Sequence, residues 1–334
     1  MPYAMRAKFG LSLSNRAVLF GWASLDDLLD AAQIAEQSGY FHGIWVGDNL
    51  LSKPRAEAIV TLSAIAARTQ QVRLGTICLA SFPLRDPILL AIQWASLDLL
   101  SRGRTILAVC NGGSALDGPQ FAHELEVMRV PSRERVGRVV EGIAILRRLW
   151  CEERVTHQGK HYQFKDVELL PKPVQRPVPI YMAINPKEGR VDAATVDRIL
   201  RRVAAHADGW QTDATPVETF RARFDAIRDY AARQGRDPSK LESCLHLMVN
   251  INDDRDRAFR EAETFLRSYY GAGAVSRERA ELWLAYGSPA TVIAKIQTYL
   301  DAGCTMPVLR FVSPNLQEQL QRCIAEVLPA FQTT

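Results

Sequence analysis

The side chains best suited to chemistry in this sequence are polar residues that directly follow short apolar runs. Among them stand one carboxylate, one thiol and one guanidinium, in Asp48, Cys110 and Arg310. The other members carry hydroxyl or amide groups, which supply neutral hydrogen bonds. Such a set, without histidine, argues against a histidine-based hydrolase and against a metal centre, and suits a large polar heterocycle. The set comprises Ser14, Asn15, Asp48, Asn49, Ser81, Cys110, Asn111, Gly112, Asn185, Gln211, Thr212, Asn250, Asn252, Arg310 and Ser313.

The elements that must position this set are short apolar runs, which alternate with longer segments of helical period. Ser24 and Asp27, three residues apart, indicate a capping box at the start of the first helix. The apolar runs predict strands at 6–14, 43–47, 72–79, 105–109, 180–184, 209–212, 244–251 and 308–312. The helical segments lie at 24–38, 57–69, 87–100, 133–150, 192–207, 217–234, 255–270, 289–302 and 316–328.

Eight βα units follow from this alternation, and either a closed barrel or a doubly wound sheet can be built from them. No glycine-rich dinucleotide loop follows the first strand, so we expect an α/β fold of the single (β/α)8 TIM-barrel type over residues 1–334. The carboxyl ends of the strands form the active-site face of such a barrel. The polar set is therefore expected to meet there.

Two segments interrupt the alternation and are expected to be insertions. Residues 153–179, after the fourth helix, read as a hairpin around Gly159 and then a connector with four prolines, which exclude helix and interior strand. Residues 271–287, after strand 7, carry no regular pattern. Both insertions are expected to shape the substrate pocket.

Composition and charge narrow the class of protein. Hydrophobic residues make up 47% and charged residues 23%, as in ordinary globular domains. The formal net charge is +4 with the two signs interspersed, so we expect neither nucleic-acid nor membrane binding. Residues 1–10 show no signal-peptide pattern, and the six cysteines have no C-x-x-C spacing. We expect a cytoplasmic protein with buried free thiols and no metal.

Three segments carry a family resemblance: VRLGT at 72–76, PLRDP at 83–87 and ASLDLLSRGR at 95–104. They resemble the bacterial luciferase-like flavin-dependent monooxygenases and oxidoreductases. Shorter matches follow in order at 108–112, 133–135, 141–143, 149–150, 170–175, 207–210 and 302–303. The resemblance covers nearly the whole chain, and it too implies a single (β/α)8 barrel.

The resemblance implies a cofactor at the carboxyl ends of the strands, either reduced FMN or the deazaflavin coenzyme F(420). The leading interpretation is a monooxygenase that uses reduced FMN and O₂ on a small organic substrate, with a separate flavin reductase as partner. The alternatives are an F(420)-dependent dehydrogenase or reductase, and a flavin-binding barrel without catalysis. Related enzymes also pair, so we expect a homodimer through apolar residues of the second and third helices, Ile59, Leu62, Ile65, Leu89, Ile92 and Trp94.

The resemblance also assigns residues to the cofactor. Alignment places a non-proline cis peptide, which supports one face of the ring, between Ile77 and Cys78. Cys110 matches a reactive thiol of luciferases, although a buried inert thiol fits the same position. Asn111, Gly112 and Asn185 follow strand ends beside the cofactor. Trp210 is either a wall of the pocket or a barrel filler.

Two positions depart from the family pattern. Asn49 follows Asp48 where relatives place a catalytic histidine, so we expect Asn49 to orient reacting atoms and Asp48, substrate or water to move protons. Asn111 replaces an arginine that contacts the cofactor phosphate. We therefore expect Lys187 and Arg190, with the start of the helix near Asp192, to bind the phosphate instead.

Overall fold

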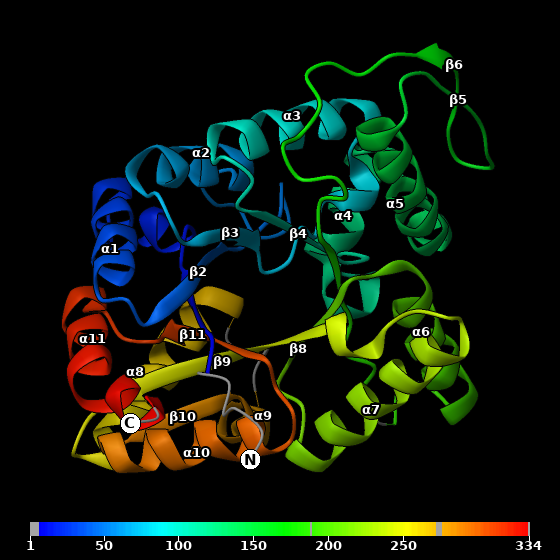
Figure 1. The fold of residues 1–334 in the computed structure, drawn as a ribbon. Helices are drawn as coiled ribbons and strands as arrows, with labels where there is room; N and C mark the ends of the chain where they lie inside the picture. Colours follow the sequence, from blue (N-terminus) through cyan, green and yellow to red (C-terminus); the bar gives the residue numbers. More distant parts are fainter. Residues whose placement is uncertain (1–6, 188, 272–275, 333–334) are drawn as a thin grey trace.

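The predicted strands close into a parallel barrel in a computed structural model, which describes residues 7–187, 189–271 and 276–332 (Figure 1). The order around the barrel is β1, β2, β3, β4, β7, β8, β9 and β11, and β11 pairs with β1 to close it. The strands are β1 Phe9–Leu13, β2 Phe41–Val46, β3 Arg73–Thr76, β4 Thr105–Val109, β7 Ile180–Ala183, β8 Gly209–Asp213, β9 Glu242–Ile251 and β11 Met306–Phe311. The predicted TIM barrel is confirmed.

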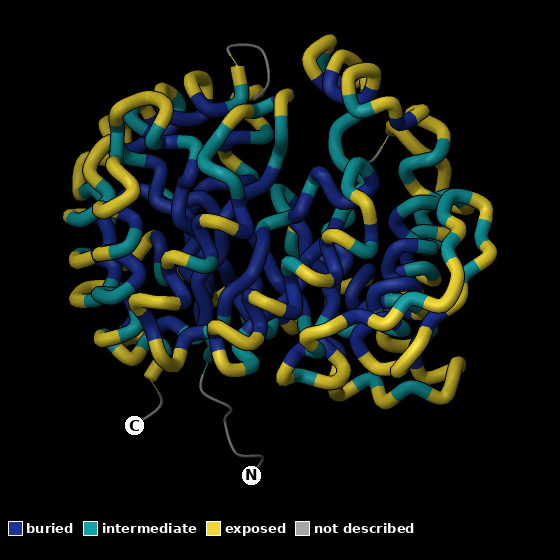
Figure 2. Tube along the Cα trace, turned by 90° about the horizontal axis from the view of Figure 1, so that it is seen from above, coloured by how far each residue is buried: buried dark blue, intermediate teal, exposed yellow. Residues whose placement is uncertain are grey.

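Helices surround the barrel, and burial falls from its centre to the outside (Figure 2). The capping box predicted for α1 is present, because Ser24 Oγ accepts from the Asp27 amide at 3.0 Å and the Asp27 carboxylate accepts from the Ser24 amide at 2.7 Å. The outer helices are α1 Leu25–Gln37, α2 Ala58–Arg68, α3 Pro87–Leu100, α5 Arg135–Cys151, α6 Ala193–His206, α7 Val217–Arg233, α10 Pro289–Asp301 and α11 Leu316–Arg322.

Large aromatic side chains fill the inside of the barrel. Trp45 of β2 and Tyr181 of β7 are almost completely buried, with ring centroids 6.3 Å apart. Gly75 makes room for Trp45, since a Cβ atom at Gly75 would lie 2.4 Å from the indole ring. The barrel centre is thus solid, and a ligand must bind at its carboxyl end.

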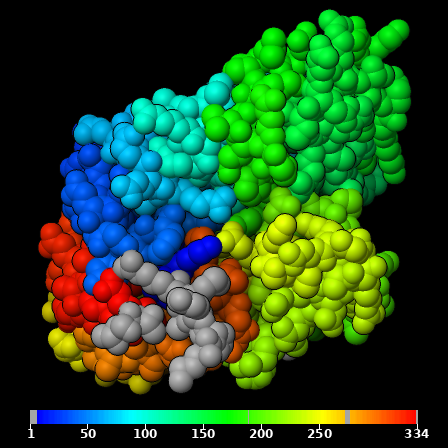
Figure 3. Space-filling view, in the orientation of Figure 1, coloured from blue at the N-terminus to red at the C-terminus, as the bar shows by residue number. Residues whose placement is uncertain are grey.

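The first insertion forms the predicted hairpin. β5 Val155–Gln158 and β6 Gln163–Val167 pair antiparallel and stand out from the body beyond α5 (Figure 3). The proline connector that follows contains two cis X-Pro bonds. A helix missed in the sequence, α4 Pro119–Val127, lies between β4 and α5.

The second insertion is larger than expected. α10 packs against α7 and leads into β11, so it is the barrel helix that follows strand 7. Three elements precede it: α8 Arg255–Tyr270, α9 Arg277–Trp283 and the short strand β10 Leu284–Gly287. β10 extends the edge of β9 beyond the point where β8 ends. The second insertion therefore begins with α8 at Arg255, and not at residue 271 as the sequence predicted.

Most of the apolar residues expected at a dimer interface belong to the core of the chain. Ile59, Leu62, Ile65 and Trp94 are buried, whereas Leu89 and Ile92 are 57% and 39% exposed. In the described ranges, no helix is both long and apolar enough to cross a membrane.

Candidate active site

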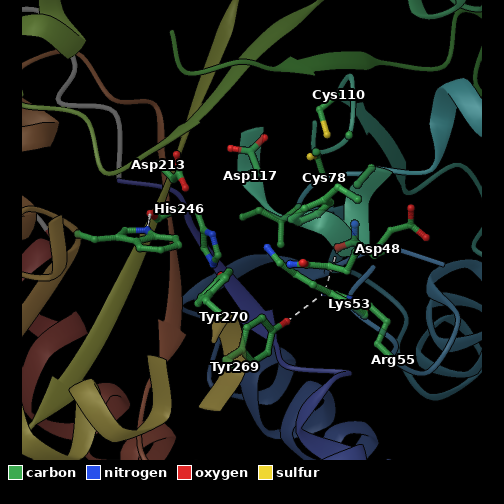
Figure 4. Close-up of a pocket in the computed structure, with 18 of the residues that line it drawn as sticks. Asp48, Lys53, Arg55, Cys78, Cys110, Asp117, Asp213, His246, Tyr269 and Tyr270 are labelled. Carbon is green, nitrogen blue, oxygen red and sulfur yellow. Dashed lines mark hydrogen bonds between the residues drawn. The ribbon is translucent and has the colours of Figure 1, made fainter. Parts of the chain in front are cut away.

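A cavity of about 430 Å³ opens at the carboxyl ends of the barrel strands (Figure 4). It combines residues from the predicted polar set with residues from α8 and α9. The described lining comprises Asp48, Asn49, Lys53, Arg55, Ile77, Cys78, Ala80, Cys110, Gly112, Gly113, Leu116, Asp117, Gln120, Phe121, Lys187, Arg190, Asp213, His246, Tyr269, Tyr270, Arg279, Trp283 and Arg310.

The segment after β3 forms one wall of the cavity. The peptide bond between Ile77 and Cys78 is cis, as the family resemblance implied. Cys78 and Cys110 lie close together on this wall and are partly exposed, so the expectation of buried thiols is wrong for them; Cys151 is exposed as well. A hydrogen bond with Cys110, together with burial, raises the pKa of the Cys78 thiol well above its ordinary value.

Asp48 follows β2 and forms hydrogen bonds with the segment after the cis bond. Its Oδ2 accepts from the Ser81 amide at 2.8 Å, and its Oδ1 accepts from Arg85 Nη2 at 3.3 Å. Burial raises the pKa of Asp48, although Arg85 and Ser81 offset part of that rise. Because both of its oxygens are engaged, Asp48 joins the loop after β2 to the segment after β3.

Asn49 points its amide along the loop that follows β2. Its Oδ1 accepts from Arg55 Nη2 at 3.0 Å, and its Nδ2 donates to Ser52 Oγ at 3.1 Å. The carboxylate of Glu124, on α4, accepts from the amides of residues 50–52 and holds this loop in place. Asn49 therefore lines the cavity and positions Arg55 within it.

The loop after β4 meets the cavity through Cys110 and Gly112. Gly112 has φ +69°, and a Cβ atom there would lie 2.7 Å from the Ala80 carbonyl oxygen, so only glycine fits without strain. Arg135 Nη1 donates to the carbonyl oxygens of Asn111, Gly112 and Gly113. Asn111 itself is outside the described lining.

The loop after β7 brings Lys187 and Arg190 to the cavity. Asn185 instead lines a neighbouring hollow of about 450 Å³, which shares Lys187, Arg190 and Arg279 with the cavity. Burial lowers the pKa of Lys187. Asp192 caps α6 by accepting from the Thr195 amide at 2.6 Å, so a carboxylate already occupies that helix start.

Trp210 packs away from the cavity, between β8 and α7. Its ring centroid lies 5.1 Å from that of Phe220, and its Nε1 donates to the Ile184 carbonyl at 2.9 Å. Of the two interpretations of Trp210, the structure places it as a filler between strand and helix, and it is not part of the described lining.

The cavity contains a histidine, contrary to the sequence analysis. His246 lies in the middle of β9, and its ring meets Trp283 of α9 edge-on at 5.9 Å. Burial, with Arg310 nearby, lowers the pKa of His246 well below its ordinary value, so the imidazole is neutral near pH 7. Its Nε2 has no hydrogen-bond partner among the described residues.

The wall opposite the cis bond was missed in the sequence, except for Arg310. It consists of Tyr269 and Tyr270 from the last turn of α8, with Arg310 of β11 and the loop residues Lys53 and Arg55. Burial and the charge of Arg55 lower the pKa of Lys53 to about 8. The sequence did contain one signal for this wall: two adjacent tyrosines at the end of a predicted helix, directly before an insertion.

The charges of the cavity fit an anionic ligand. Of the described lining residues, six are lysine or arginine and three are aspartate. Each aspartate has an arginine partner: Asp48 with Arg85, Asp117 with Arg190 and Asp213 with Arg279, at 3.3 to 3.5 Å. Unpaired cationic groups in a partly closed site favour phosphate or carboxylate. FMN and F(420) both carry a phosphate, so the donor set suits either cofactor.

A sequence profile of the luciferase-like monooxygenase family matches residues 5–306. The chain belongs to this family. Among curated relatives, an F(420)-dependent glucose-6-phosphate dehydrogenase of Nakamurella multipartita is 28% identical over 96% of this chain and 96% of its own length.

Two solved structures share the fold of this luciferase-like chain. An F(420)-dependent secondary alcohol dehydrogenase, in complex with an F(420)-acetone adduct, superposes with a TM-score of 0.81 at 20% identity and covers 98% of this chain and all of that one. A monooxygenase of Streptomyces bottropensis gives a TM-score of 0.78 at 23% identity, over 97% of this chain and all of that one. The relatives of this chain are thus oxidoreductases, both dehydrogenases and monooxygenases.

Proposed function

We propose that this chain is an F(420)-dependent oxidoreductase that moves a hydride between the deazaflavin and the carbon of a small alcohol or carbonyl compound. The observation that carries the proposal is the similarity, along nearly the full chain, to F(420)-dependent glucose-6-phosphate dehydrogenases. This similarity favours the deazaflavin alternative over the FMN-dependent monooxygenase that led the sequence analysis. A separate flavin reductase is unnecessary in this reaction, because the alcohol supplies the hydride.

The residues that would hold the cofactor lie on two sides of the cavity. Ile77, Cys78 and Gly112 offer a wall for the ring system, and Lys187 and Arg190 offer charge for the phosphate. When bound, F(420) supplies a ring carbon that accepts or returns a hydride. The protein's own part is to bind the substrate, exclude water and provide a group for the hydroxyl proton.

The test is turnover by the full chain. Purified protein is incubated with F(420) and, one at a time, glucose 6-phosphate, 2-propanol and a hydroxylated fatty acid, and the visible absorbance of oxidised F(420) is followed. In parallel, reduced FMN is added and oxygen uptake is recorded. We expect at least one alcohol to bleach F(420), with no protein-dependent oxygen uptake.

Two results would contradict the proposal in different ways. Oxygen uptake with reduced FMN, and no binding of F(420), would restore the monooxygenase interpretation. Binding of a cofactor without turnover on any substrate would support a non-catalytic flavin-binding barrel.

We also propose that the chain forms a homodimer through exposed apolar residues of α2 and α3. Val60 and Leu89 are 69% and 57% exposed, and Leu99 and Leu100 extend the patch. Light scattering at micromolar concentration is expected to give the mass of two chains. A monomer would overturn this proposal without affecting the cofactor assignment.

A further inference from the structure

Oxidation of an alcohol releases a hydroxyl proton as well as a hydride, and a base must take that proton. Asn49 stands where the family resemblance implies a histidine, and its amide cannot exchange a proton near neutral pH. Asp48 has both carboxylate oxygens bonded to Ser81 and Arg85. The proton therefore needs another acceptor in the cavity.

Arg55 links the position of Asn49 to Tyr269 on the opposite wall. Its Nη2 donates to Asn49 Oδ1 at 3.0 Å, and its Nη1 donates to the Tyr269 hydroxyl oxygen at 3.1 Å (Figure 4). Because Nη1 donates this hydrogen bond, the phenol oxygen acts as acceptor toward the guanidinium. The last turn of α8 thus places a titratable oxygen beside the site of the missing imidazole.

Cationic side chains from three separate elements face Tyr269. The guanidinium carbons of Arg310 on β11, Arg16 after β1 and Arg55 after β2 lie 5.3, 5.5 and 5.7 Å from its ring centroid. Lys53 adds a fourth positive charge, and its Nζ lies 4.7 Å from the ring centroid of Tyr270. Within the described ranges, these four cations form no ion pair with a carboxylate. A negative charge on Tyr269 would compensate them.

The pKa values of Tyr269 and of its neighbour Tyr270 are shifted in opposite directions. Burial alone would raise the pKa of Tyr269, but the charges of Arg310, Arg55 and Lys53 outweigh burial and lower the pKa from 10 to about 7. Tyr270 has the opposite balance, because burial dominates and raises its pKa. Two like groups with opposite shifts in one cavity are typical of an acid–base site.

His246, in the middle of β9, is the competing base in this cavity. Its neutral imidazole has an unpartnered Nε2, but the nearby Arg310 and burial oppose its protonation. It would therefore release a proton far below neutral pH and is a weak acceptor. The same positive charge that weakens His246 favours a phenolate at Tyr269.

We propose that Tyr269 is the catalytic acid–base residue of this cavity and takes over the task of the absent histidine, an inference that rests on the proposed F(420)-dependent function. In the oxidative direction, the substrate C–H bond breaks and its hydrogen leaves as a hydride, with both electrons, to the oxidised deazaflavin. The O–H bond breaks, its proton goes to the phenolate oxygen of Tyr269, and the C–O bond becomes C=O. In the reverse direction, the Tyr269 phenol returns the proton to the carbonyl oxygen.

The first test needs neither cofactor nor substrate. The ultraviolet absorbance of tyrosinate is recorded against pH for the wild-type chain and for the matched variants Tyr269→Phe and Tyr270→Phe. We expect one of the nine tyrosines to ionise near pH 7 in the wild type and in Tyr270→Phe, and not in Tyr269→Phe. Ionisation of all tyrosines only near the ordinary value of about 10 would overturn the proposal.

The second test measures turnover and F(420) binding in the same three proteins, with the alcohol that bleaches F(420). Tyr269→Phe is expected to lower kcat by about 100-fold or more, to keep the Kd for F(420) within about twofold, and to lose the wild-type fall of kcat at low pH. Tyr270→Phe is expected to retain the fall of kcat at low pH. Wild-type kcat in Tyr269→Phe would overturn the proposal. Absence of F(420) binding in the wild type would instead refute the proposed function. In that case the absorbance titration would still test whether Tyr269 ionises near pH 7.

Discussion

The two walls of the cavity differ in origin and in chemistry. The first wall follows β2, β3 and β4 and carries Asp48, Cys78 and Cys110, whose polar groups are hydrogen-bonded or have raised pKa values. The second wall comes mainly from the other end of the chain, with Tyr269 on α8 and Arg310 on β11, and is completed by Lys53 and Arg55. Positive charge lowers the pKa of Tyr269 on this wall, whereas burial raises the pKa of Tyr270.

We therefore assign cofactor binding to the first wall and proton transfer to the second. The first wall offers a surface fixed by main-chain geometry, including the cis bond after Ile77 and the left-handed Gly112. The second wall offers charge and a phenol that titrates near neutral pH. We therefore expect changes to the second wall to alter pH dependence, and changes to the first to alter cofactor binding.

The largest effect is expected when Tyr269 and Arg310 of the second wall are removed together with the elements that carry them. A chain that ends at Trp150 keeps β1 to β4 but loses β11 and β7, the partners of β1 and β4. Two open strand edges and an unfilled core then remain, so we expect no cooperative thermal transition by circular dichroism. A monomeric, cooperatively melting fragment would show that the first wall folds alone.

Arg310→Met tests the charge of the second wall. Removal of this cation raises the pKa of Tyr269, so the phenolate fraction at pH 7 falls and activity recovers only at higher pH. We expect kcat at pH 7 to fall about tenfold to a hundredfold, with the low-pH limb of the kcat profile moved upward. Arg279→Met is the control, because Arg279 stacks on Trp283 instead of Tyr269. An unmoved limb in Arg310→Met would contradict the electrostatic account.

Asn49→Ala tests the link between the walls. Loss of the Oδ1 acceptor frees Arg55 and weakens its hold on Tyr269, so kcat is expected to fall about threefold to tenfold. Asn49→Asp keeps an acceptor for Arg55 but adds a negative charge that offsets the cations around Tyr269. We therefore expect its low-pH limb to move upward and its kcat to recover only above that limb. Steady-state kinetics are measured for both variants. Equal losses of kcat above the low-pH limb would mean that position 49 does not act through Arg55.

Cys110→Ala tests the thiol that matched the luciferase pattern. On the first wall, the thiol carries no proton for the proposed reaction, so kcat is expected to change by less than about threefold. The Kd for F(420) is measured as well, since the side chain lines the cofactor side of the cavity. A loss of kcat as large as that of Tyr269→Phe would move the chemistry to the first wall.

The first wall and Arg310 of the second wall could be predicted from the sequence, whereas Tyr269 and His246 could not. Strand ends are marked by a change from apolar to polar residues, which located Asp48, Asn49 and Cys110. Tyr269 escaped because helical period shows that 255–270 is a helix but not which end of the barrel it ends at. His246 escaped because it lies inside β9, which continues to Ile251 beyond the end of β8 at Asp213, the residue that pairs with His246. Sequence spacing records neither effect.

The most direct test of the account is a calorimetric titration of the wild-type chain with oxidised F(420) and, separately, with FMN at neutral pH. We expect F(420) to bind at one site per chain and FMN to bind at least about tenfold more weakly. Tighter binding of FMN than of F(420) would contradict it.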